Sequence, residues 1–209
     1  MTGTIDFYTN PMSRGRVAHW MLEEVGAPYR THYLAFGPEM HAAEYLAINP
    51  LGKVPAIVHG RHAVTECAAI CAYLAEAFPE AELAPTPEGR ADFYRWMFFA
   101  AGPLEAALVN RTLGFEVPED RRRLVGYGAL DRMFDALETA VAGRDFIAGS
   151  RFSAADVYVG SQIGWGLQFG SIEERPAFRD YWARISARPA FARAGAADNA
   201  AAPVRAAAG

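Results

Sequence analysis

The hydrophobic pattern of this chain changes once, at the proline-rich stretch PEAELAPTPEG, residues 79–89. Before this stretch, short apolar runs alternate with segments in which apolar residues recur every three or four positions, as they do in strands and helices. After it, the strong patterns all have the helical period. A stretch with three prolines and no run of large apolar side chains is typical of a linker. We therefore predict two domains, residues 1–80 and 90–209, joined by a linker at 81–89.

The first domain is predicted to be a small α/β domain with the element order β-α-β-α-β-β-α. Its first helix has the clearest pattern, because Val17, Met21 and Val25 recur at helical spacing and Gly26 follows as a stop signal. The expected strands are Ile5–Tyr8, Tyr29–Leu34 and a pair within VPAIVHGRHAV, and the expected helices are Arg14–Val25, an irregular Pro38–Ile48, and Glu66–Phe78.

The second domain is predicted to be all-helical. The expected helices are Arg90–Leu113, Glu119–Val141, Ser153–Gly170 and Ala177–Ala187. Gly102-Pro103 predicts a kink in the first of them, and SAAD at 153–156 predicts a capping box at the start of the third. Beyond Arg193 the chain is rich in alanine without an apolar stripe, so we expect this tail to be frayed or loosely docked.

Charge and composition exclude several classes of protein. A formal net charge of −4 argues against a nucleic-acid-binding face. The start, MTGTIDFYTN, lacks the basic and apolar stretches of a signal peptide, and no uncharged stretch is long enough to span a bilayer. Cys67 and Cys71 share a helix face without further zinc ligands and do not make a disulfide framework. We therefore expect a cytoplasmic protein with no metal, no nucleic-acid partner and no membrane segment.

The segment NPLGKVPAIV, residues 49–58, combines turn residues with a proline at the entrance of an apolar strand. A cis Val54–Pro55 bond would bend the chain there and leave the amide N–H and carbonyl of Val54 free to pair with a bound peptide. A trans Pro55 at a strand edge is the alternative. Lys53, beside Val54, is the single lysine of the chain.

Residues 64–74, VTECAAICAYL, place Glu66 and Cys67 at the start of a predicted helix. The free N–H groups of a helix N-terminus attract a carboxylate, and the Glu66 carboxylate attracts an ammonium group. Together they suit the two charges of an α-amino acid. The alternative is that Glu66 only caps the helix.

Four segments together resemble the cytosolic glutathione transferases, and a further segment, PMSRGRV, resembles the serine-type branch found in bacteria. The four segments are NPLGKVPAIV, TECAAICAYLAE, FSAADVYVGSQI and RPAFRDYWARISARPAF, and the resemblance extends over residues 5–191. It implies a thioredoxin-like N-terminal domain that binds glutathione, followed by an all-helical domain, in a homodimer whose interface contains the helices Arg90–Leu113 and Glu66–Phe78.

The resemblance also implies roles for single residues. The main chain of Val54, after a cis bond to Pro55, pairs with the cysteinyl unit of glutathione, and Lys53 lies near the glycine carboxylate. Glu66 and the backbone N–H of Cys67 hold the γ-glutamyl group. One further glycyl contact is implied for His41.

The turn YTNPMSRGR, residues 8–16, is where the glutathione thiol is expected to lie. "PMSRGRV" resembles the serine-type branch, in which the Ser13 hydroxyl donates a hydrogen bond to the thiolate. Tyr8 is the rival, since other branches use a tyrosine at the end of the first strand. A backbone donor near Met12, or Arg14, is a further alternative, and from the local sequence alone Ser13 reads as a helix cap.

The resemblance implies an apolar pocket for the second substrate, between the two domains. The candidate residues are Met12, Phe36, Trp96, Phe99, Trp165 and Phe169. Trp165 and Phe169 also fit a core position, since they are four residues apart on one helix. The expected function is conjugation of the glutathione thiolate to small apolar electrophiles. The alternatives are glutathione-dependent reduction of disulfides or peroxides, and non-catalytic binding of glutathione or apolar ligands.

Overall fold

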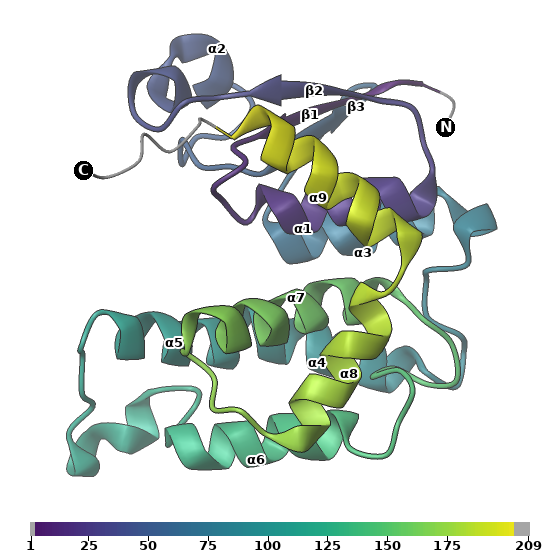
Figure 1. Cartoon of the computed structure of the whole chain (residues 1–209). Coiled ribbons are helices and arrows are strands. Elements are labelled where there is room, and N and C mark those ends of the chain that lie inside the picture. Colours follow the sequence, from purple (N-terminus) through teal and green to yellow (C-terminus); the bar gives the residue numbers. More distant parts are fainter. Residues whose placement is uncertain (1–2, 203–209) are drawn as a thin grey trace, which may run out of the picture. The chain divides into compact units, whose positions relative to one another are not determined.

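The computed structural model describes residues 3–202, which divide into two compact units (Figure 1). One unit contains the chain up to Glu82 together with the segment from Arg188 onward, and the other is Leu83–Ala187. The expected second domain, 90–209, is therefore wrong at its end, because the helix that follows Arg188 packs on the α/β unit. The last part of that prediction, residues 203–209, lies outside the described residues.

The α/β unit contains a four-stranded sheet with the strand order β2-β1-β3-β4. The strands are β1 (Ile5–Thr9), β2 (Tyr29–Tyr33), β3 (Ala56–His59) and β4 (His62–Thr65). β2 is parallel to β1, while β3 pairs antiparallel with both β1 and β4. The helices are α1 (Gly15–Val25), a 3-10 turn (Pro38–His41), α2 (Ala43–Leu46), α3 (Cys67–Ala77) and a second 3-10 turn (Pro79–Ala81). The predicted element order is confirmed.

The alternation of β1 separates the two faces of this sheet. Ile5, Phe7 and Thr9 are fully buried, whereas Asp6 and Tyr8 on the opposite face are partly exposed. The ring of Phe7 lies 5.4 Å from that of His19, so the buried face of β1 packs on α1. α1 ends at Gly26, whose φ of 66° is the left-handed conformation that stops a helix at little cost in a glycine.

α9 (Pro189–Ala201) lies along α1 within the same unit (Figure 1). It buries Ala190, Ala194 and Asp198, spaced four residues apart, and the ring of Phe191 meets Trp20 edge-on at 5.0 Å. The expectation of a frayed or loosely docked tail beyond Arg193 is therefore wrong for residues 194–201. Small buried residues let two helices approach closely without the large apolar stripe that sequence patterns detect.

The second unit is a bundle of helices. They are α4 (Arg90–Phe99), a π-helical turn (Ala100–Leu104), α5 (Glu105–Thr112), a 3-10 helix (Glu119–Leu124), α6 (Leu130–Val141), α7 (Ala154–Phe169) and α8 (Pro176–Ser186). A π-helical turn lies at Gly102-Pro103, where a kink was expected. The single helix expected at Glu119–Val141 is wrong, because Val125 is extended and Gly128 has a φ of 63°, which separates the 3-10 helix from α6.

The predicted capping box of α7 is confirmed. The Asp156 carboxylate accepts hydrogen bonds from the N–H and the hydroxyl of Ser153, both at 2.9 Å, and from the N–H of Ile147 at 2.8 Å. The Tyr181 hydroxyl of α8 donates a further one at 2.7 Å. Asp156 is fully buried and thus joins α7, α8 and the preceding loop. Within residues 3–202, none of the helices combines the length and apolar character needed to cross a membrane.

Candidate active site

Ser13 lies in the tight turn between β1 and α1. Its hydroxyl donates to the Asn10 carbonyl at 2.7 Å and accepts the N–H of Gly15 at 2.9 Å. The Ser13 N–H donates to the same Asn10 carbonyl at 3.0 Å. Ser13 therefore serves a backbone amide of the first turn of α1. The Ser13 hydroxyl can donate to a ligand instead of to Asn10, because the Asn10 carbonyl still accepts the Ser13 N–H. Moving the hydroxyl proton from Asn10 to the ligand costs about one neutral hydrogen bond, roughly 1 kcal/mol.

Asn10, which the sequence analysis did not single out, holds this turn against the sheet. Its side-chain amide donates to the carbonyl of Leu34 at 2.8 Å, just beyond β2, and its side-chain oxygen accepts the N–H of Met12 at 2.9 Å. The Met12 N–H, one of the alternative thiolate donors, is therefore already engaged. Asn-Pro is a turn signal in the sequence, but the contact with Leu34 depends on the folded sheet.

Gly15 is required by the packing of the turn. A Cβ atom at this position would lie 1.8 Å from Oγ1 of Thr9, at the end of β1, and 3.0 Å from the Ser13 oxygen. Thr9 is fully buried, so its side chain has no room to move away. The first turn of α1 thereby lies directly against the sheet.

Tyr8 lies on the face of β1 opposite to Thr9. Its ring stacks on His32 with 4.6 Å between centroids and lies 5.6 Å from Tyr45. Burial, followed by the negative charge of Asp6, raises the pKa of Tyr8 above its ordinary value of 10.0. A phenol with a raised pKa is a weaker proton donor to an anion, which disfavours the rival of Ser13.

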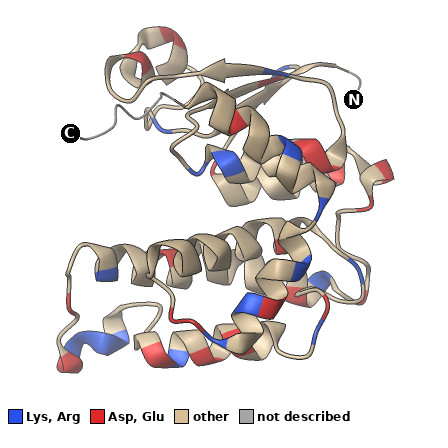
Figure 2. Cartoon of the chain, in the orientation of Figure 1, with Lys and Arg blue, Asp and Glu red and all other residues tan. Residues whose placement is uncertain are grey.

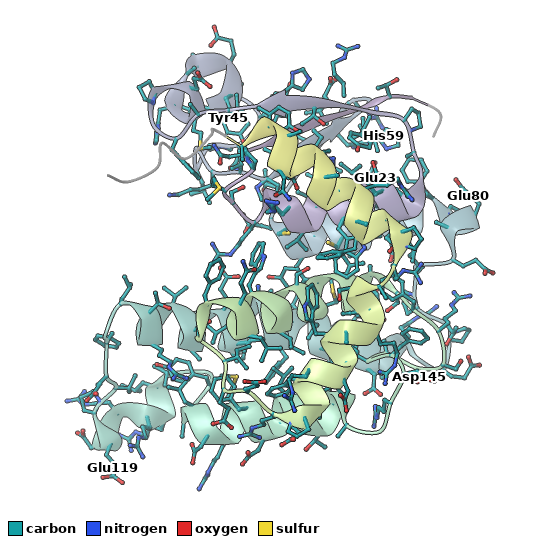
Figure 3. The ribbon with its side chains drawn as sticks, in the orientation of Figure 1. Glu23, Tyr45, His59, Glu80, Glu119 and Asp145 are labelled. Atoms are coloured by element: carbon teal, nitrogen blue, oxygen red, sulfur yellow. The ribbon has the colours of Figure 1, made fainter. Side chains whose placement is uncertain are left out.

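The segment before β3 has the geometry needed for pairing with an extended peptide. The Val54–Pro55 bond is cis, as one of the two alternatives predicts. Among the described residues, neither the N–H nor the carbonyl of Val54 has a hydrogen-bond partner. The neighbouring Lys53 carbonyl is held by Tyr45, labelled in Figure 3, at 2.5 Å and by the Asn49 amide at 2.7 Å. The main chain of Val54 is thus held in place with its own polar groups unpaired.

Lys53 and His41 lie in adjacent loops at this edge. Both side chains are exposed, and Nδ1 of His41 is paired with the Gly37 carbonyl at 2.8 Å. Gly52 has a φ of 59°, and a Cβ there would meet the His41 ring at 3.2 Å. The structure therefore brings His41 beside the loop that carries Lys53.

Glu66 and Cys67 form the start of α3. Glu66 has a φ of 65° and a ψ of 116°, a conformation rare outside glycine, and its exposed carboxylate has no partner among the described residues. No side chain caps α3. The Cys67 sulfur donates to the carbonyl of Arg14 at 3.6 Å. This contact places the start of α3 next to the turn that holds Ser13.

The six residues predicted to line the apolar pocket are divided between the two units. Met12 and Phe36 of the α/β unit are each 60% exposed. In the helical unit, Trp96 is buried and its ring meets Phe99 edge-on at 5.3 Å. Trp165 is half-buried and Phe169 is 74% exposed, so Phe169 is not a core residue.

Two further features bear on ligands. The helical unit has an open hollow of about 1090 Å³, lined by α5, the start of α6 and the chain between them, and none of the predicted site residues lines it. Across residues 3–202, no group of three or more His, Cys, Asp or Glu side chains is arranged to hold a metal ion.

Comparison with known proteins gives the same family for both units. The family model "Glutathione S-transferase, N-terminal domain" matches residues 12–77, and "Glutathione S-transferase, C-terminal domain" matches residues 105–189. Glutathione S-transferase A of Pleuronectes platessa is 29% identical over 177 residues, which cover 78% of this chain and 77% of that protein.

Solved structures agree. The glutathione transferase of Methylococcus capsulatus is similar with a TM-score of 0.77 and 27% identity, covering 94% of this chain and 100% of that one. A sphingomonad glutathione S-transferase complexed with glutathione has a TM-score of 0.75 and 27% identity, covering 93% and 98%. The chain belongs to the glutathione S-transferase family.

Proposed function

We propose that this protein conjugates the thiolate of glutathione to small apolar electrophiles, with Ser13 as the thiolate donor. The observation that carries this proposal is the contact between Cys67 and the Arg14 carbonyl. It puts a hydroxyl, the N-terminus of α1 and the uncapped N-terminus of α3 side by side. Membership of the family, and its relatives named glutathione S-transferase, support the reaction class.

The chain offers a complementary group for each part of the tripeptide γ-Glu-Cys-Gly. The Glu66 carboxylate suits the ammonium group of the γ-glutamyl unit, and the free N–H groups from Cys67 onward suit its carboxylate. The N–H and carbonyl of Val54 suit the cysteinyl main chain, in the manner of an added strand. Lys53 and His41 are the candidates for the glycine carboxylate.

Ser13 is the preferred donor to the sulfur. An unperturbed thiol has a pKa of about 8.5, and lowering it by about two units requires roughly 2.7 kcal/mol of preferential stabilisation of the thiolate. One hydroxyl hydrogen bond to an anion and a nearby helix N-terminus supply a stabilisation of this size. Ser13 holds the proton throughout and forms no covalent bond. The raised pKa of Tyr8 favours Ser13 over the rival.

The remaining parts of the proposal follow the family. The electrophile is taken up by an apolar site, where proximity to the thiolate accelerates attack. The protein acts in the cytoplasm as a homodimer. Reduction of disulfides by an enzyme cysteine is not favoured, because residues 8–16 contain no cysteine.

Conjugation of glutathione to a chromogenic aryl halide tests the proposal. We expect activity in the wild type, a loss of about 10- to 100-fold in Ser13→Ala, as for a hydrogen bond to a charged group, and near-wild-type turnover in Tyr8→Phe. Full activity in Ser13→Ala with loss in Tyr8→Phe would transfer the role to Tyr8. A wild type that neither conjugates nor binds immobilised glutathione would refute the proposed function.

A further inference from the structure

We propose that the last helix, α9, positions the Ser13 turn, acting through Arg16 and with Asn199 and Asp198 as its positioning residues. This inference rests on the proposed function of Ser13. All of the contacts involved lie within the α/β unit.

Arg16 connects α9 to the turn. One guanidinium nitrogen donates to the carbonyl of Pro11 at 3.2 Å, inside the turn, and the other donates to Oδ1 of Asn199 on α9. The Nε of Arg16 also lies 3.9 Å from Oδ2 of Asp198. Because the guanidinium group is planar and rigid, fixing one of its edges fixes the direction in which the other donates.

Asp198 is itself held in a fixed position. It is fully buried, and its Oδ1 is paired with Nδ1 of His19 at 2.8 Å. The other ring nitrogen of His19 lies 2.9 Å from the hydroxyl of Tyr29, and this hydroxyl donates to Glu23 at 2.5 Å. Asp198 is thereby fixed to α1 and to β2.

Charged residues lie on both α1 and α9 (Figure 2). The contacts between them form two separate groups. Near the carboxyl end of α1, Arg193 pairs with Glu23 at 2.6 Å and Arg188 pairs with Glu24 at 2.7 Å. Near the amino end, Asp198 and Asn199 face Arg16. Only the second group contacts the turn that holds Ser13, through Arg16. The first group therefore holds α9 in place, while the second also orients Ser13.

The turn is therefore anchored from two sides. Asn10 ties it to the sheet through the Leu34 carbonyl at 2.8 Å, and Arg16 ties it to α9 through the Pro11 carbonyl. Releasing the second anchor leaves Ser13 attached but less well directed. A hydrogen bond to a thiolate depends strongly on direction, and small displacements of such a donor lower the rate of the chemical step.

The test compares three variants of the full-length chain. Asn199→Ala removes the acceptor for Arg16, Asn199→Asp keeps an acceptor at the same place, and Arg193→Ala removes a contact of α9 from the other group. For each we measure stability to urea, kcat and KM for glutathione conjugation, and the pH profile of kcat/KM. Taken with the electrophile varied at saturating glutathione, this profile reports the protonation of bound glutathione, which a purely structural role would not change.

We expect Asn199→Ala to lower kcat about 3- to 10-fold, the effect of one hydrogen bond, to shift the pH profile to higher pH, and to leave KM for glutathione nearly unchanged. Asn199→Asp should restore both kcat and the profile. Arg193→Ala should lower stability and leave the profile where it is. A wild-type profile in Asn199→Ala, or equal shifts in Asn199→Ala and Arg193→Ala, would overturn the inference. An inactive wild type would overturn the proposed function and this inference with it.

Discussion

Glu66 provides a sharp test because its backbone strain and its proposed binding role can be separated. A non-glycine residue at a φ of 65° and a ψ of 116° costs about 1–3 kcal/mol of stability. Glycine relieves this strain but adds about 0.5–1 kcal/mol of entropy to the unfolded chain. We therefore expect Glu66→Gly to raise the free energy of unfolding by up to about 2.5 kcal/mol, measured by urea denaturation.

The same variant should bind glutathione more weakly. Loss of one charge-assisted hydrogen bond costs about 1.5–3 kcal/mol, or about 10- to 150-fold in Kd, measured by calorimetry. Glu66→Ala is the matched control, since it loses the carboxylate but keeps the strain. It should lose the same affinity without the gain in stability. If Glu66→Gly is less stable than the wild type and binds glutathione equally well, Glu66 has neither the strain nor the binding role assigned to it.

Two further predictions concern stability. Asp156→Ala leaves the N–H groups of Ile147 and Ser153 and the Tyr181 hydroxyl without their buried acceptor, so we expect the free energy of unfolding to fall by at least about 3 kcal/mol; a loss below about 1 kcal/mol would contradict the role of Asp156. Burial raises the pKa of Glu23, but hydrogen bonds from Tyr29 and Arg193 outweigh it and bring the pKa below 4.5. The stability that Glu23 contributes is therefore present above pH 4.5 and is lost as the pH falls through the lowered pKa, so Glu23→Gln should be less stable than the wild type at neutral pH and equal to it in acid. A difference that does not change with pH would contradict this assignment.

The elements of the fold that sequence patterns predicted are those with a large apolar stripe or a strong local signal. The alternation in β1 and the helical spacing of Val17, Met21 and Val25 are of this kind, as is the interruption of the α-helix at Gly102-Pro103. α9 was not predicted as a docked helix. Its buried positions are alanines and an aspartate, and its charged partners lie on α1, far away in the sequence.

In the candidate site, too, some residues have a signal in the local sequence and others do not. The turn residues around Val54-Pro55 and the acidic residue before α3 stand out locally, and so does Ser13. Asn10 and Asn199 do not, because their contacts with Leu34 and Arg16 exist only after the sheet and the helices have assembled. The strain at Glu66 has no local signal either, since nothing in the sequence marks a glutamate for a positive φ.

The most direct test of the central claim is the pKa of the glutathione thiol in its complex with the protein. Spectroscopic titration of the thiolate in the wild type and in Ser13→Ala measures it without any electrophile. We expect a pKa about two units below the free thiol's value of about 8.5 in the wild type, and a return toward that value in Ser13→Ala. An equally lowered pKa in Ser13→Ala, or an unshifted one in the wild type, would contradict this claim.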